Sequence, residues 1–134
     1  MTDLVQRAAV LLEEKYNSPV HTVSAALKTE SGKIITAVNI DHFLGFVCVE
    51  TAALTIAINQ GEYKFRQIVA MRKKDDTGEI TIANMCGKCR QIFHDYAPGI
   101  EVVTENGIRK IEELLPDAFT RQRGKIQTTI RNVQ

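Results

Sequence analysis

A nearly uninterrupted apolar stretch between residues 48 and 59 constrains the fold of this chain more than any other feature. A typical β-strand has about five or six residues, so this stretch predicts a helix that is buried on most of its surface. Gly61 follows it as a helix stop.

Helical and extended patterns alternate along the rest of the chain. Apolar residues at helical spacing predict an amphipathic first helix, and alternating apolar residues predict strands. The expected elements are a helix over 3–16, strands over 23–27 and 33–40, a loop over 41–47, the buried helix over 48–59, a strand over 66–71, a short extension over 80–83, a helix over 86–96, strands over 100–103 and 108–111, and a helical turn over 112–115. This order predicts an α/β fold, a three-layer α-β-α sandwich in which two hairpins make the sheet mixed.

Length and charge narrow the possible partners. The 134 residues fit a single domain, 1–134, and 17 basic against 16 acidic residues give a net charge of +1. This balance favours a small-molecule ligand and argues against nucleic acid as the main partner. We see no apolar run of membrane-spanning length and no secretory signal, and three cysteines cannot all pair within one chain, so we expect reduced thiols and a cytoplasmic protein. The polar, basic tail over 121–134 is expected to be loosely ordered or docked on a partner subunit.

The cysteines lie in two segments that both open predicted helices: Cys48-Val49-Glu50 and Cys86-Gly87-Lys88-Cys89. Free backbone N–H groups and the helix dipole stabilise thiolates at such positions. Two sulfurs from one helix and a third from a neighbouring helix leave a tetrahedral zinc ion with one open position, which is the pattern of a catalytic site. The sequence therefore predicts one Zn²⁺ per subunit, bound by Cys48, Cys86 and Cys89.

Glu50 follows Cys48 by two residues and is the expected catalytic residue. It can face the metal without binding it and transfer protons between a zinc-bound water and a substrate. Because three thiolates leave the site negatively charged, we expect compensation from Lys88 or Arg90, one of which is predicted to hydrogen-bond a sulfur.

Three other interpretations of the cysteines remain open at this point. The Cys86–Cys89 segment is also typical of a redox pair, although Cys48 and Glu50 would then have no role. A structural zinc site would need a fourth ligand, for which His42 is the nearest candidate. Unpaired buried cysteines can also act as small hydrophobic residues. His21 and His94 are expected to be pocket or surface residues rather than ligands.

Five short segments form a characteristic set between about Val20 and Phe119. They are Val23-Ser24-Ala25-Ala26-Leu27, Val38-Asn39-Ile40-Asp41, Cys48-Val49-Glu50, Cys86-Gly87-Lys88-Cys89-Arg90-Gln91 and Glu113-Leu114-Leu115-Pro116-Asp117-Ala118-Phe119. Through them the sequence resembles the cytidine deaminase family, and within it the branch of blasticidin S deaminases.

The resemblance implies a five-stranded mixed sheet, a homotetramer, and hydrolytic replacement of the 4-amino group of a cytosine nucleoside by oxygen, with release of ammonia. It implies that Asn39 and Asp41 hydrogen-bond a sugar hydroxyl, and that Ser24 and the backbone of Val49 contact the substrate. Phe119 is expected to help close a neighbouring subunit's pocket. Asn39 is alternatively a turn residue at a strand end, and Phe119 a core anchor.

Four positions depart from the family pattern. Met85 stands where the family usually has proline, Val49 where it has alanine, Asp41 where it has glutamate, and His21 where it has phenylalanine. These departures fall around the expected pocket, so the choice among cytidine, deoxycytidine and blasticidin S stays open. A zinc-stabilised domain without catalytic activity remains an alternative from another class.

Overall fold

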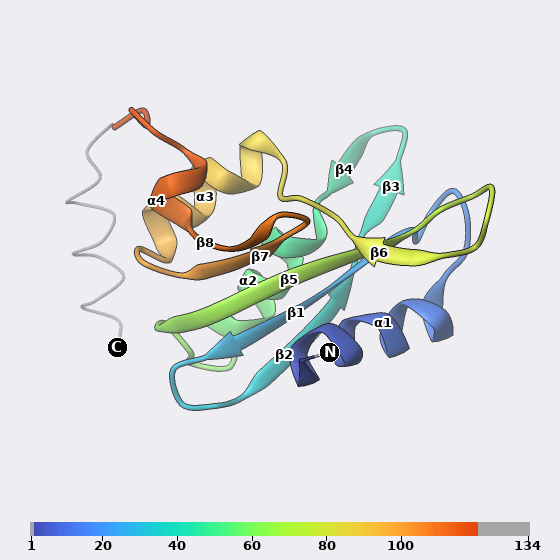
Figure 1. The fold of residues 1–134 in the computed structure, drawn as a ribbon, viewed down its shortest axis with the longest axis horizontal. Helices are drawn as coiled ribbons and strands as arrows, with labels where there is room; N and C mark the ends of the chain where they lie inside the picture. Colours follow the sequence, from blue (N-terminus) through green and yellow to red (C-terminus); the bar gives the residue numbers. More distant parts are fainter. Residues whose placement is uncertain (1, 121–134) are drawn as a thin grey trace.

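A computed structural model describes residues 2–120, in which one six-stranded sheet carries helices on both faces. Figure 1 shows α1 in front of this sheet and α2 behind it. The elements are α1 (Asp3–Lys15), β1 (Val23–Thr29), β2 (Ile34–Val38), β3 (Ile40–His42), β4 (Gly45–Val47), α2 (Val49–Asn59), β5 (Phe65–Lys73), β6 (Ile80–Ile82), α3 (Gly87–Tyr96), β7 (Glu101–Thr104), β8 (Gly107–Lys110) and α4 (Ile111–Leu114). The expected tail over 121–134 lies outside the described residues.

The sheet is mixed, as predicted, with strand order β2-β1-β5-β7-β8 and with β6 paired to β5. Only β5 and β7 run parallel among these pairs, and the other pairs are antiparallel. Asn106-Gly107 lies in the β7–β8 turn, where Gly107 has a φ of +102° that favours glycine.

Alternating residues of the strands build two separate apolar cores. On β1, Ala25 and Leu27 pack with α2, α3 and α4, whereas Ala26 packs with α1 on the other face. On β5, Ile68 and Val69 divide between the same two cores. This period of two residues produces the three-layer sandwich that the sequence predicts.

Two segments differ from the sequence-based expectation. The extension over 80–83 forms a sixth strand, β6, because Met71 to Lys73 of β5 run past the segment that pairs with β7 and pair with β6 instead. The segment over 41–47 is mostly a short hairpin, β3–β4, and not a loop. Its apolar side chains are exposed, so it lacks the alternation of buried and exposed residues by which strands are recognised in a sequence.

The hairpin leads directly into the buried helix α2. Asn39 separates β2 from β3, which ends the strand expected over 33–40. Gly61 follows the last turn of α2 with a φ of +82°, the left-handed conformation that commonly terminates helices. Within residues 2–120, none of the helices is long and apolar enough to cross a membrane.

Candidate active site

The first turns of α2 and α3 bring the three cysteines together. Cys48 is the N-cap of α2, Cys86 is the N-cap of α3, and Cys89 lies in the first turn of α3. The three Sγ atoms lie within 4.8 Å of one another, and those of Cys48 and Cys86 are 3.7 Å apart. The predicted placement of both cysteine segments at helix N-termini is confirmed.

This spacing fits a tetrahedral zinc ion. Two sulfurs that each lie about 2.3 Å from zinc at the tetrahedral angle are about 3.8 Å from each other. Among the described residues, the group of side chains able to hold a metal consists of these three cysteines. His42 is not part of this group; its Nδ1 accepts a hydrogen bond from the Leu44 backbone N–H and its ring stacks on Phe43. The donor set therefore fits zinc with one position left open for another ligand.

The three thiols differ in exposure and in acidity. Cys89 is fully buried, and burial raises its pKa, an effect that the Thr51 hydroxyl opposes. Burial also raises the pKa of Cys48. Burial by itself would raise the pKa of Cys86, but the Cys89 amide and the other two thiols outweigh it, and the pKa is lowered. The buried sulfur of Cys89 therefore depends most on a metal or a hydrogen-bond donor to carry a negative charge.

Glu50 lies in the first turn of α2, beside the cysteines. It is only 7% exposed, and burial raises the pKa of its carboxyl group. The Glu50 charge is one of the smaller influences on the three thiols, and it acts to raise the pKa of each. A carboxyl group with a raised pKa holds and releases protons nearer neutral pH, as a proton-transfer residue needs.

Thr51 is a site residue that the sequence analysis missed. Its Oγ1 lies 3.3 Å from the Sγ of Cys89, so a hydroxyl of α2 contacts a sulfur of α3. It follows Cys48 by three residues, the same spacing that separates Cys86 from Cys89. That repeated spacing at a helix start was the available signal, because residues three apart share a helix face.

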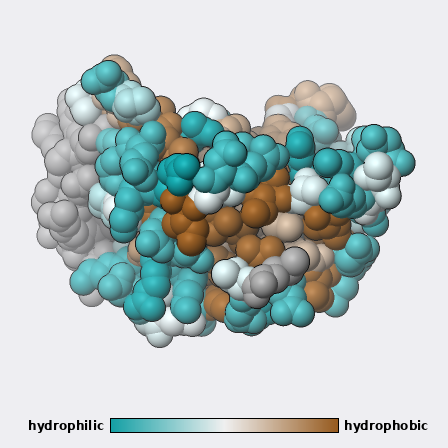
Figure 2. All heavy atoms as spheres, in the orientation of Figure 1, coloured by the Kyte–Doolittle hydropathy of each residue, from teal (hydrophilic) through white to brown (hydrophobic). Residues whose placement is uncertain are grey.

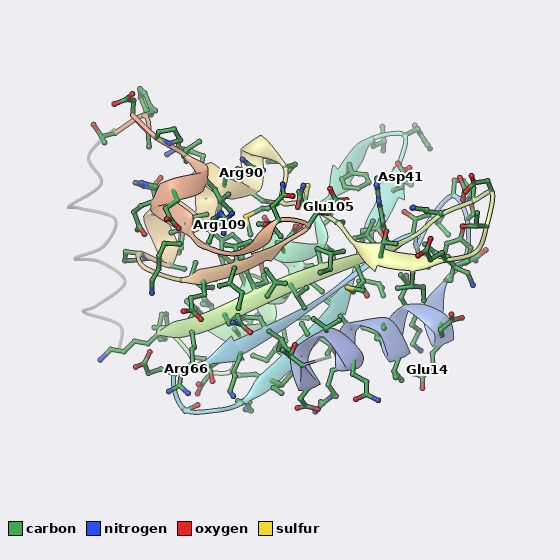
Figure 3. The ribbon with its side chains drawn as sticks, viewed as in Figure 1. Glu14, Asp41, Arg66, Arg90, Glu105 and Arg109 are labelled. Carbon is green, nitrogen blue, oxygen red and sulfur yellow. The ribbon has the colours of Figure 1, made fainter. Side chains whose placement is uncertain are left out.

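The expected pairing of Lys88 or Arg90 with a sulfur is not found among residues 2–120. Arg90 Nε donates to the Met85 carbonyl at 2.8 Å, and its Nη1 donates to the Leu114 carbonyl at 3.1 Å. Figure 3 labels Arg90 in the region of α3 and α4. Lys88 is exposed. Arg90 thus fixes the backbone at Met85, just before Cys86.

Asn39 is fully buried, and its side chain joins the ends of two strands. Its Oδ1 accepts hydrogen bonds from the backbone N–H groups of Thr22 at 2.8 Å and Val23 at 3.0 Å. Its carbonyl is hydrogen-bonded to Nδ1 of His21 at 2.8 Å, so His21 is a neighbour of Asn39. These contacts agree with the alternative interpretation, in which Asn39 is a structural residue at a strand end.

The other expected substrate contacts are dispersed. Ser24 is turned away from the cysteines, because β1 points its side chain toward α1, where Oγ donates to the Ala8 carbonyl at 2.6 Å. The Ser24 hydroxyl therefore faces α1 in this structure, and its expected substrate contact stays a prediction. Asp41 is exposed on the β3–β4 hairpin, where Figure 3 labels it.

Three further residues occupy distinct surroundings. Val49 is buried at the first position of α2, between Cys48 and Glu50. Phe119 is 67% exposed near the end of the described chain, and its carbonyl accepts a hydrogen bond from Gln91 Nε2 at 3.1 Å. It is therefore not a core anchor. His94 is partly buried on α3, with Nδ1 enclosed.

Comparison with known proteins identifies the family. No family profile matches the sequence. The chain is 38% identical over 128 residues to a blasticidin-S deaminase from Bacillus cereus, covering 89% of this chain and 91% of that protein. It is 31% identical over 107 residues to a probable cytidine deaminase from Dictyostelium discoideum, covering 75% and 69%. The solved cytidine deaminase of Burkholderia pseudomallei superimposes with a TM-score of 0.70 at 29% identity, covering 89% of this chain and 100% of that one.

These similarities extend over most of the chain, so they include both cysteine segments and the sheet that supports them. They agree with the site geometry, in which three thiols and a buried carboxyl group meet at two helix starts. The chain belongs to the family of cytidine and blasticidin S deaminases and is a hydrolytic deaminase.

Proposed function

We propose that this deaminase binds one zinc ion through Cys48, Cys86 and Cys89 and replaces the 4-amino group of a cytosine nucleoside by oxygen, releasing ammonia. One observation carries the proposal: three Sγ atoms lie within 4.8 Å of one another, and Glu50, in the first turn of the helix that Cys48 caps, is only 7% exposed. A redox pair or a fully ligated structural zinc site would give no role to this buried Glu50.

Zinc, the Glu50 carboxyl group and backbone groups at the two helix starts have separate roles in the proposed reaction. When bound, zinc supplies a Lewis acid that polarises a water molecule at its open position. Glu50 takes one proton from the attacking water and passes it to the pyrimidine ring nitrogen. It then takes the second proton, from the hydroxyl group formed at C4, and passes it to the amine, so that the C4–N bond breaks, the C4 carbonyl forms and ammonia leaves. Backbone groups of Val49 and Cys86, at the starts of α2 and α3, contact the leaving amine and the oxygen that becomes negative.

The sugar end of the substrate is assigned to the β3–β4 side of the site. Asp41 presents an exposed carboxylate there, which accepts a hydrogen bond from a sugar hydroxyl. Asn39 lies two residues earlier, but its Oδ1 already accepts two backbone hydrogen bonds, so only its amide nitrogen has spare capacity. Its role toward a ligand therefore depends on donation from Nδ2.

The proposed substrates are cytidine and deoxycytidine, with blasticidin S as the second candidate. The similarity to the blasticidin-S deaminase of Bacillus cereus, 38% identity over 91% of that protein, supports the second candidate. All three molecules carry the same cytosine amine, so the reaction at the cysteine site is common to them. They differ at the sugar, where Asp41 is placed.

We also propose a homotetramer, as the family resemblance implies. The β3–β4 hairpin supports self-association, since Phe43 is 90% exposed and Leu44 is 82% exposed. In Figure 2 the hairpin tip, at the upper right, has hydrophobic colouring. Apolar side chains that are exposed together commonly mark a contact surface. Phe119 is proposed to reach a neighbouring subunit's pocket.

The test is loss of the cytosine absorbance, with ammonia measured in parallel. Zinc-loaded protein is incubated with cytidine, deoxycytidine and blasticidin S, and zinc is counted per chain. We expect at least one substrate to lose its amine with one zinc bound per chain. No reaction with any of the three, in protein with one zinc per chain, would contradict the proposed substrate class. Absence of zinc from active protein would contradict the metal site.

A further inference from the structure

The sulfur of Cys89 is buried, and a negative charge on it would need stabilisation by nearby groups. Cys89 is fully enclosed, whereas Cys48 is partly exposed and Cys86 is exposed. Water therefore does not solvate its sulfur, and a buried anion needs a metal or hydrogen-bond donors around it. The two nearest cations in sequence do not supply this, because Arg90 donates to two carbonyls and Lys88 is exposed.

Thr51 contacts the sulfur of Cys89 directly. The distance from its Oγ1 to Sγ is 3.3 Å, which is within range of a hydrogen bond to sulfur. A thiolate has no proton, so in a metal-bound Cys89 the sulfur is the acceptor and the Thr51 hydroxyl is the donor. The contact joins α2 to α3 at the point where their first turns meet.

The Thr51 hydroxyl has a different hydrogen-bond partner from that of Thr55, the next threonine on the same helix. Threonine in a helix commonly hydrogen-bonds a carbonyl one turn earlier. Thr55, one turn later on the same helix, does so: its Oγ1 donates to the Thr51 carbonyl at 2.9 Å. Thr51 instead directs its hydroxyl across to α3. The two threonines therefore differ in partner while sharing helix and residue type.

The two helices also match each other in spacing. In α3 the N-cap Cys86 is followed three residues later by Cys89, and in α2 the N-cap Cys48 is followed three residues later by Thr51. Each helix thus contributes a sulfur at its N-cap and a side chain from its first turn to the same cluster. In α3 that second side chain is a ligand, and in α2 it is a hydroxyl that contacts this ligand.

We propose that Thr51 is a positioning residue for the metal, whose hydroxyl donates a hydrogen bond to the Cys89 thiolate and holds this buried sulfur in place to bind zinc. The inference rests on the proposed zinc site and adds the side chain that supports it. Removing hydrogen bonds to metal ligands typically weakens metal affinity about 10- to 100-fold. We expect Thr51→Val, which keeps the shape of the side chain and removes the hydroxyl, to weaken zinc affinity by that factor.

The experiment measures metal binding and not turnover. Zinc affinity is determined by competition with a chromophoric chelator for the wild type, Thr51→Val, Thr51→Ser and Thr51→Ala. The same proteins are loaded with Co²⁺, and their sulfur-to-cobalt charge-transfer bands are recorded. A hydrogen bond lowers the energy of the sulfur lone pairs, so its loss should move the band to longer wavelength in the valine and alanine variants. Thr51→Ser should keep the wild-type band and affinity.

Thr55→Val is the matched control, because it removes an exposed hydroxyl from the same helix that bonds only a carbonyl. It should bind zinc and cobalt like the wild type. Should Thr51→Val fail to fold, the serine and alanine variants still decide, since both lack the methyl group and differ only in the hydroxyl. Equal affinity and equal bands in those two variants overturn the inference. If the wild type itself binds neither metal, the proposed zinc site has failed instead.

Discussion

Replacing Glu50 with glutamine tests the proton-transfer role most directly. Glutamine has nearly the same size and shape, so it fits the enclosed space where only 7% of Glu50 is exposed. Its amide neither accepts nor releases a proton at neutral pH. Because the position is buried at the start of α2, bulk water does not easily replace the missing carboxylate.

The expected loss follows from the number of proton transfers assigned to this residue. One positioned acid or base typically contributes about 10²- to 10⁴-fold to the rate. Glu50 serves the attacking water, the ring nitrogen and the leaving amine, so we expect a loss at the upper end of this range. A decrease of about 10⁴-fold in kcat corresponds to about 5 kcal/mol in activation free energy.

The assay combines turnover with metal content. Loss of cytosine absorbance gives kcat, and elemental analysis gives zinc per chain for the wild type and Glu50→Gln. Glu14→Gln is the matched control, since it makes the same chemical change at an exposed position of α1, across the sheet from α2 (Figure 3). A variant that retains zinc and turns over within tenfold of the wild type would refute the role of Glu50. Loss of zinc in the variant would also refute it, by showing that Glu50 supports the metal.

Four other perturbations have defined outcomes. As pH falls, kcat/KM should decline through a pKa above 4.5, the ordinary glutamate value. The reason is that burial raises the pKa of Glu50, which must be ionised to act as a base. A profile of kcat/KM that stays flat down to pH 4.5 would contradict this. A chelator should lower the unfolding free energy of the wild type by about 3–4 kcal/mol, which is the stabilisation expected from a metal present at about 10²–10³ times its Kd. The unfolding free energy of Cys89→Ser should not change when the chelator is added. Asn39→Ala should cost about 1–3 kcal/mol in chemical denaturation, since two backbone N–H groups lose their acceptor, whereas Asn39→Asp should retain most of the stability. The double variant Phe43→Ser/Leu44→Ser should have a lower mass in sedimentation equilibrium than the wild type, and an unchanged mass would show that the hairpin is not a subunit contact.

The positions of the three cysteines at helix starts were predictable because they depend on local geometry. Residues three apart on a first helical turn face the same side, so Cys86 and Cys89 must project together. The position of Glu50 beside Cys48 follows from the same helix start. These relations hold within one turn of one helix, and no long-range contact is needed to see them.

The side-chain partners that the sequence did not predict depend on contacts between distant segments. The orientation of Ser24 is fixed by the pairing of β1, which sends its hydroxyl to the Ala8 carbonyl of α1. The guanidinium of Arg90 reaches the Leu114 carbonyl in α4, far along the chain. A charge next to a cysteine in sequence therefore did not identify the group that contacts its sulfur.

The sequence by itself determined the helix starts, the alternation that makes a three-layer fold, and the spacing of three cysteines and a glutamate. Only the tertiary structure decided that α2 and α3 begin side by side and that the Thr51 hydroxyl faces Cys89. It also decided that 80–82 extends the sheet and that 40–47 forms an exposed hairpin. The physical reason is range: helix periodicity and strand alternation are set by neighbouring residues, whereas the partner of a side chain is set by the packing of elements that are distant in sequence.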